Sequence, residues 1–391
     1  MRRYTAEDED RIRLQARVRD WVRTGLLRPE QAEQLRSGLQ VGLRRTGVML
    51  RVGLALFTFV IVGASVGLMF LLLDLRDEIP VGTTLAAMGA LSLVAANALV
   101  ARFRLYRHGV EEALSISGAV LLGVAAVVLG FGISGTQNAD LYVAAGLVVS
   151  ALTGIGIYLR FGFQYAGVGA LVLAAISPLP LGSLSSSWKH LLAAGISGIA
   201  LAAANVTGQQ VSEERFQDDA GVFRAAALVC AYLSLNVYAI GGLSMLFGST
   251  IEPWFIRSTY AATWVLPVLG LHAGVRIRDR RLIEVSLALA VVTLVTNKSY
   301  LGLARQPWDP MLLGILLVGV AIVVRRWLAA GTGGARAGYT AVQLLESESR
   351  AIQVAGMASA TVHPGPIGES SPTHTEFSGG RSGGAGGGGE F

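Results

Sequence analysis

The chain has 391 residues, of which 52% are hydrophobic and only 15% are charged. Soluble domains carry about 25% charged residues, so this composition excludes an ordinary soluble protein. The formal charge of +6 does not indicate nucleic acid as a partner, because the basic residues are dispersed among the ends of apolar runs. The lone cysteine, Cys230, rules out an intrachain disulfide, and no disulfide-linked partner is expected.

Residues 1–46 are polar and rich in arginine, and they predict a short cytoplasmic helical hairpin instead of a signal peptide. Acidic residues at positions 7–10 follow Thr5, which suits an N-cap and the positive end of a helix dipole. Gly25 can end this first helix, and Pro29 suits the first turn of a second one. The apolar face of the hairpin is small, so we expect it to dock on itself, on the inner loops or on a protein partner.

Long apolar runs follow the hairpin, and they predict an all-α, polytopic transmembrane helical bundle over residues 47–328. Residues 52–73 are an uncharged stretch of 22 residues, which as a helix would be about 33 Å long, enough for a bilayer core. The same test predicts about ten spans, near 47–73, 80–101, 113–135, 141–159, 161–182, 190–208, 225–248, 258–275, 282–302 and 309–328. Only Arg160, Phe161 and Gly162 separate the fourth span from the fifth. A continuous helix over 141–182 would be about 63 Å long, so we expect a tight turn at Arg160.

The basic residues give an independent indication of orientation, because arginine and lysine concentrate in cytoplasmic loops. With the N-terminus inside and ten spans, 27 of the 32 basic residues fall on the cytoplasmic side. A miscounted helix would invert every later loop and spoil this alternation. We therefore predict a multi-pass protein of the inner (plasma) membrane, with the lipid bilayer as its solvent and both termini cytoplasmic.

After the last span the composition changes to glycine, serine and proline. The sequence SGGRSGGAGGGGEF closes the chain and is typical of a flexible coil. Residues 329–391 are therefore predicted to be a disordered, Gly-rich cytoplasmic tail.

The hairpin resembles a known group of proteins. Its sequence from Trp21 through Gly25 to the pair Gln31–Ala32 is similar to the N-terminal hairpin of predicted bacterial membrane proteins grouped as a domain of unknown function, whose signature has Trp, Gly, an aliphatic residue and Gln-Ala in this order. The segment 300–310 with Arg325-Arg326-Trp327 likewise resembles uncharacterised conserved membrane proteins. The resemblance implies a bacterial inner-membrane protein and no established activity.

Polar residues inside the predicted spans are candidates for function, because they are costly in a bilayer. Asn236 is expected near the midplane of the seventh span, where it could bond a neighbouring helix or line a cavity. Five further residues each lie three to five positions from the cytoplasmic end of their own span. They are Asn97, Gln164, Asn205, His272 and Glu284. If their helices converge, these residues would form a polar vestibule with His272 and Glu284 as its titratable pair; snorkelling of polar side chains to the interface is the alternative.

No sequence motif for catalysis, nucleotide binding or metal binding stands out, so no cofactor, metal site or catalytic residue is predicted. The first functional hypothesis is a non-enzymatic scaffold, sensor or accessory subunit that contacts a protein partner through the cytoplasmic hairpin. The alternative is a small-solute transporter built from two five-helix halves of opposite orientation. A membrane-embedded enzyme ranks last.

Overall fold

The computed structural model describes most of the chain up to residue 331 and four residues beyond it. The described ranges are 4–23, 27–44, 46–210, 214–239, 252–303, 306–331, 335–336 and 339–340. Most of the predicted tail, 329–391, therefore lies outside the described residues. The chain divides into two compact units, Met1–Ala321 and Ile322–Phe391. The second contains the end of the last helix and a two-residue antiparallel pairing of β1 (Ala335–Arg336) with β2 (Tyr339–Thr340).

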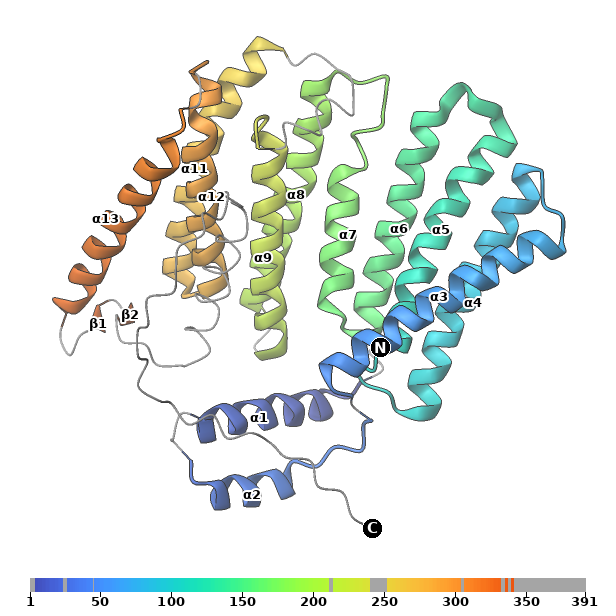
Figure 1. Cartoon of the computed structure of the whole chain (residues 1–391), viewed down its shortest axis with the longest axis horizontal. Helices are drawn as coiled ribbons and strands as arrows, with labels where there is room; N and C mark the ends of the chain where they lie inside the picture. Colours follow the sequence, from blue (N-terminus) through green and yellow to red (C-terminus); the bar gives the residue numbers. More distant parts are fainter. Residues whose placement is uncertain are drawn as a thin grey trace, which may run out of the picture. The chain divides into compact units, whose positions relative to one another are not determined.

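The described residues of the first unit are almost entirely helical (Figure 1). The predicted hairpin contains α1 (Ala6–Arg23) and α2 (Pro29–Gly38), and Thr5 Oγ1 caps α1 by accepting the Asp8 N–H at 3.2 Å. The other helices are α3 (Val48–Leu72), α4 (Glu78–Phe103), α5 (Val110–Ser134), the 3-10 turn η1 (Gly135–Asn138), α6 (Ala139–Phe161), α7 (Gln164–Ile176), α8 (Ser186–Gln210), α9 (Glu214–Leu235), α11 (Pro253–Ile277), α12 (Arg280–Tyr300) and α13 (Asp309–Ala329). Each of the ten predicted apolar runs thus contains at least part of a helix.

Six segments of the described residues are long and apolar enough to cross a membrane, which indicates a membrane protein. They are Val48–Leu72, Glu78–Phe103, Val110–Phe161, Ser186–Gly208, Arg280–Tyr300 and Asp309–Trp327. The third contains two helices, α5 and α6, which pack against each other on either side of η1. The number of helices that cross the bilayer stays a prediction.

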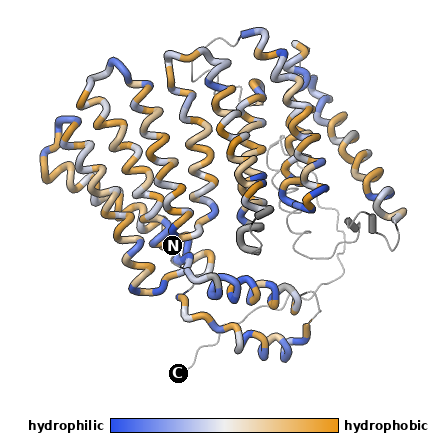
Figure 2. The backbone as a smooth tube through the Cα atoms, turned by 180° about the vertical axis from the view of Figure 1, so that it is seen from behind, coloured by the Kyte–Doolittle hydropathy of each residue, from blue (hydrophilic) through white to orange (hydrophobic). Residues whose placement is uncertain are grey.

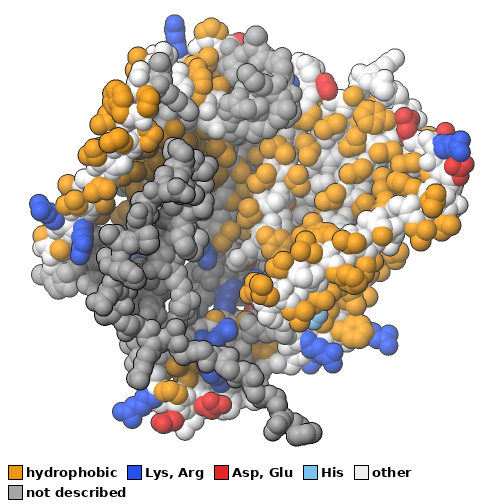
Figure 3. Space-filling view, viewed as in Figure 1, with side chains coloured by type: hydrophobic (Ala, Val, Ile, Leu, Met, Phe, Trp, Pro, Cys, Tyr) orange, Lys and Arg blue, Asp and Glu red, His pale blue; other side chains and the backbone are white. Residues whose placement is uncertain are grey.

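The surface of the helices is apolar where a soluble protein would be polar. In α3 only Thr58 is buried, and side chains such as Leu56, Phe57 and Val60 are exposed. Figure 2 shows hydrophobic residues along the length of α3–α8 and hydrophilic residues at the helix ends and along α1. In Figure 3 hydrophobic side chains cover much of the visible face, with charged side chains mostly at its margins. Exposed apolar surface of this extent fits a hydrocarbon solvent.

Glycines allow α4, α5 and α6 to pack closely in succession. A Cβ atom added to Gly89 of α4 would lie 3.1 Å from the Gly118 carbonyl oxygen of α5. One added to Gly123 of α5 would lie 2.8 Å from the Gly146 carbonyl oxygen of α6. Larger side chains would force these backbones apart, so the small residues set the packing distance.

Two helices differ from the predicted spans. The break between the fourth and fifth runs falls at Gly162, whose φ of +71° ends α6, and α7 has only 13 residues. The run 225–248 corresponds to α9, which begins at Glu214 and ends at Leu235. The predicted run begins later than α9 because it contains only uncharged residues, whereas Asp219 and Arg224 of α9 are charged and are buried with polar partners. Residues 240–251 lie outside the described part.

Candidate functional site

Tyr4, two residues before α1, is buried in the end of the helix bundle. Tyr4 is 4% exposed, and its hydroxyl donates to the Leu105 carbonyl oxygen at 3.0 Å. Its ring meets Tyr106 edge to face with centroids 4.9 Å apart, and it packs in one cluster with residues of α4, α6 and α7. Burial raises the pKa of this hydroxyl, and the charge of Glu111 adds to the rise. The start of the hairpin is therefore fixed to the bundle by a neutral tyrosine.

The segment after α2 is fixed to the same loop. The Arg44 N–H donates to the Arg104 carbonyl oxygen at 3.0 Å, and the Tyr106 N–H donates to the Arg44 carbonyl oxygen at 3.1 Å. These bonds form a parallel bridge between Arg44 and Leu105. Thr46 Oγ1 adds a bond to the His108 carbonyl oxygen at 3.3 Å. The hairpin thus has two attachments to the α4–α5 loop, one at each end, and we call this region the hairpin junction.

The loop between α4 and α5 is shaped for this contact by its backbone. Arg104 and Arg107 have φ values of 52° and 50°, and Gly109 has a φ of 105°. A Cβ atom at Gly109 would collide with the Arg51 carbonyl oxygen of α3. Only glycine fits here, because the backbone conformation is left-handed and α3 passes directly against it.

Two consecutive buried carboxylates lie at the start of α5, beside the junction. Glu112 is 5% exposed and forms a two-pronged ion pair with Arg51 of α3, in which Nε and Oε2 are 2.6 Å apart. Its Oε1 also accepts the Tyr165 hydroxyl of α7 at 3.1 Å. Glu112 therefore joins three helices, α3, α5 and α7, at one point. The positive end of the α5 dipole favours a negative charge in this place.

Glu111 is less completely paired than its neighbour. It is fully buried, and one carboxylate oxygen accepts the backbone N–H of His108 at 2.7 Å. Within the described part of the chain, its other oxygen has no hydrogen-bond partner, and neither has the buried Nδ1 atom of His108. An unsatisfied buried carboxylate oxygen is costly. The described residues contain no group of three or more side chains that could hold a metal ion.

The predicted vestibule residues have separate surroundings. Asn97 Oδ1 accepts Arg160 Nε and Nη2, both at 3.2 Å, and Gln164 Nε2 donates to Asp219 Oδ1 at 2.6 Å. Asn205 is half-buried in α8. His272 is exposed on α11, and Glu284 is exposed on α12, where it pairs with Arg280 at 2.6 Å. No hydrogen bond or ion pair found among the described residues joins two of the five, so the shared vestibule stays a prediction.

Asn236 lies one residue beyond the end of α9 and is fully buried. Its predicted depth near the membrane midplane stays a prediction. Its Nδ2 donates to the Tyr232 hydroxyl at 2.8 Å and to Thr296 Oγ1 of α12 at 3.0 Å, while its Oδ1 accepts the Ala239 N–H at 3.0 Å. Every polar atom of this side chain is engaged, so Asn236 bonds α9 to α12.

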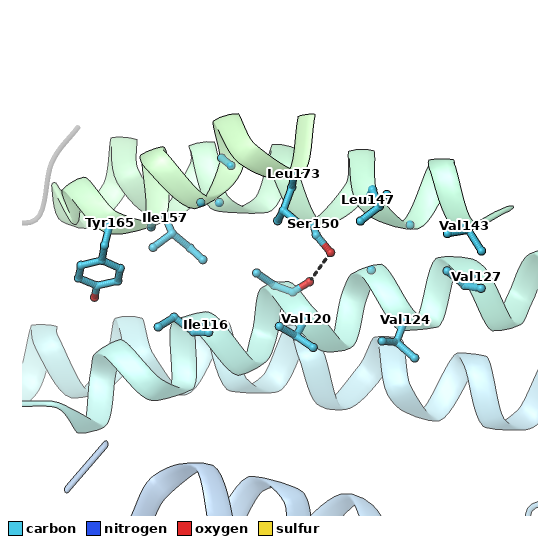
Figure 4. Close-up of a pocket in the computed structure, with 17 residues that line it drawn as sticks. Ile116, Val120, Val124, Val127, Val143, Leu147, Ser150, Ile157, Tyr165 and Leu173 are labelled. Carbon is cyan, nitrogen blue, oxygen red and sulfur yellow. Dashed lines mark hydrogen bonds between the residues drawn. The ribbon is translucent and has the colours of Figure 1, made fainter. Parts of the chain in front are cut away.

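An apolar cavity of about 430 Å³ lies between α5, α6 and α7. Figure 4 shows Ile116, Val120 and Val124 in a row along α5, facing α6, with Tyr165 at one end. One hydrogen bond crosses it, from Ser150 Oγ to the Ala119 carbonyl oxygen at 3.1 Å. The cavity has no set of convergent polar groups of the kind that orients a substrate.

Sequence reasoning missed Tyr4 of the junction and, beside the junction, Arg51, Glu111, Glu112 and Tyr165. The sequence does contain an indication of this cluster, because the two acidic residues Glu111 and Glu112 stand directly before the apolar run 113–135, at its predicted cytoplasmic end. Arg51 stands alone at the start of another run, where a partner could have been sought.

Comparison of the chain with protein-family models, with curated proteins and with solved structures finds no match. The resemblance of the hairpin to a bacterial membrane-protein family therefore stays a prediction.

Proposed function

We propose that the chain is a membrane-embedded scaffold, sensor or accessory subunit that presents the hairpin α1–α2 to a protein partner. The observation that carries this proposal is the double attachment of the hairpin at the junction, through Tyr4 and through Arg44–Thr46. A module tethered by one covalent link would move independently of the bundle. A module held at both ends follows the α4–α5 loop, so partner binding and the state of the helices can influence each other.

The exposed face of the hairpin supports a partner contact. Leu14 and Trp21 are 39% and 40% exposed, and residues seven apart lie on the same side of a helix. Leu35 of α2 is 45% exposed. Exposed aromatic and aliphatic side chains of this kind are common anchors at interfaces.

The proposal includes ten spans, a bacterial inner membrane and both termini in the cytoplasm. The distribution of 27 of 32 basic residues supports this orientation. In the proposed orientation, the hairpin and the junction lie on the cytoplasmic side. The end of α8, the start of α9, the end of α11 and the start of α12, which lie near Asp279, are on the same side.

The test uses affinity purification of the full chain after cross-linking in intact cells. Replacing Leu14 and Trp21 by serine should remove a specific co-purifying protein while leaving the Tyr4 attachment intact. The matched control replaces Leu303 and Trp308, an exposed Leu and Trp before α13, by serine; it should keep the partner. The same co-purifying set from both variants would refute the partner role.

A small-solute transporter is the second candidate, and the end of α9 at Leu235 is the feature that bears on it. Helix ends inside a bundle line the ion and substrate sites of many transporters. The carbonyl oxygens of Ser234 and Leu235 already have partners, His190 at 2.9 Å and the Tyr300 hydroxyl at 3.4 Å, so a solute would have to displace these bonds. A solute flux in proteoliposomes that Asn236→Leu abolishes would favour transport over the scaffold.

A further inference from the structure

Four arginines surround one pocket of about 540 Å³ where α8 and α11 end and α12 begins. They are Arg224 of α9, Arg278 in the α11–α12 turn, and Arg280 and Arg281 at the start of α12. Asp279 is the acidic residue of the lining, so the lining carries four positive charges and one negative charge.

The acidic side chains of this region that the structure describes are already engaged. Asp279 accepts the backbone N–H groups of Arg281 and Leu282 at 3.1 and 3.4 Å and is therefore the N-cap of α12. Asp219 is held by Tyr158 and Gln164. Glu284 pairs with Arg280 on the exposed side of α12. Among the residues that line the pocket, four arginines therefore face a single acidic side chain that already has partners.

Arg224 is the buried arginine of the four, and its hydrogen bonding indicates a ligand. It is 5% exposed, and its Nη1 donates to Asp279 Oδ2 at 3.2 Å. Its Nε is buried and has no hydrogen-bond partner among the described residues. A guanidinium has five N–H donors in a fixed fork, and a buried donor without an acceptor is costly. An anion in the pocket would satisfy it.

Glycines leave the space that this arginine requires. A side chain at Gly208 of α8 would collide with the Arg224 guanidinium, and a Cβ atom at Gly221 of α9 would lie 3.0 Å from Asp279 Oδ2. Both glycines line the pocket. The backbone therefore comes close on two sides without filling the volume between the arginines.

We propose that this pocket binds a phosphate group. Guanidinium forks match phosphate oxygens in two-pronged hydrogen bonds, and arginine is preferred wherever such recognition is needed. The pocket lies at the ends of helices that cross the membrane in the proposed topology, where it would face lipid headgroups. Basic pockets between such helices hold anionic headgroups. The phosphate belongs to an anionic lipid headgroup or to a soluble phosphate, and the two sources are separated by experiment.

The experiment uses the purified, delipidated full chain. Native mass spectrometry measures binding of phosphatidylglycerol and of phosphatidylcholine, and thermal melting in detergent is followed with and without inorganic phosphate. The pocket variant is Arg278→Gln with Arg281→Gln, because these two side chains are exposed and their removal leaves the buried Arg224–Asp279 pair intact. The matched control is Arg325→Gln with Arg326→Gln, two exposed arginines of α13.

Selective binding of phosphatidylglycerol that falls about tenfold in the pocket variant, and not in the control, would support the proposal with a lipid as the source. A rise in melting temperature with inorganic phosphate that is lost only in the pocket variant, with equal binding of the two lipids, would support it with a soluble source. Arg278→Lys with Arg281→Lys keeps the positive charge and loses the guanidinium fork. Its affinity for the phosphate ligand should lie between that of the wild type and that of the glutamine variant. Wild-type affinity for both ligands in the pocket variant, or equal losses in both variants, would overturn it.

Discussion

The two buried polar clusters of the first unit are built from different chemistry. The cluster at the start of α5 is ionic: Glu111 and Glu112 lie beside Arg51, and one oxygen of Glu111 is unsatisfied among the described residues. The cluster at the end of α9 is neutral, with an amide and several hydroxyls, and each polar atom of Asn236 is bonded. A satisfied neutral network fixes one packing of its helices. The ionic cluster leaves one carboxyl oxygen without a partner among the described residues, and it lies against the hairpin.

The largest expected effect is at Glu112. Glu112→Gln removes the charge opposite Arg51 and should lower the free energy of unfolding by about 3 kcal/mol, since breaking a buried pair leaves one charge uncompensated. Chemical unfolding in detergent micelles measures this loss. The double variant Arg51→Met with Glu112→Gln should recover part of it. Equal losses in the single and double variants would show that the pair is not coupled.

The neutral cluster should respond less strongly. Asn236→Ala removes three hydrogen bonds and should cost about 2 kcal/mol, because such bonds are individually weak inside a membrane. The same unfolding measurement applies, with Asn205→Ala as the control, since Asn205 is only half-buried. A loss at Asn236 larger than that at Glu112 would reverse the comparison between the two clusters.

Within the hairpin junction, substitution of Tyr4 should weaken the attachment of the hairpin to the bundle. Tyr4→Phe leaves the buried Leu105 carbonyl oxygen without its donor and should cost about 1 kcal/mol, seen as faster hydrogen exchange in α1. The docked hairpin holds Tyr4 neutral and raises its pKa. Its stabilising effect is therefore complete below the ordinary tyrosine pKa of about 10 and is lost as the pH rises toward the raised value. Wild-type protection in α1 should decline above about pH 10, and the phenylalanine variant should lack this decline.

The smallest effect is expected at Glu111, which is adjacent in sequence to Glu112, the site of the largest expected effect. Glu111→Gln replaces the carboxyl group whose second oxygen lacks a partner among the described residues, and it keeps an oxygen for the His108 backbone N–H. The free energy of unfolding should change by less than about 1 kcal/mol, in either direction. A loss as large as that of Glu112→Gln would mean that the two carboxylates act as one unit.

Sequence reasoning was sufficient for the elements that depend on local patterns. The apolar runs, the acidic residues after Thr5 and Pro29 predicted helices that the structure contains. Contacts between distant residues carry no such pattern, and Tyr4 meets Leu105 across 101 positions. The rule that membrane helices lack charge also misplaced α9, because Asp219 and Arg224 are charged and buried with partners. Asn236 was recognised as a buried bonding residue, but its place beyond a helix end was not.

Because Tyr4 and Leu105 are far apart in the sequence, they are synthesised at different times. Ribosomes add roughly 5–20 residues per second, and Tyr4 lies 101 positions before Leu105, so Tyr4 is made roughly 5–20 seconds before the loop that receives it. During this interval the hairpin has a hydrophobic tyrosine and no docking surface of its own chain. A partner that binds during synthesis would meet the hairpin undocked, and one that binds later would meet it already fixed to the membrane helices.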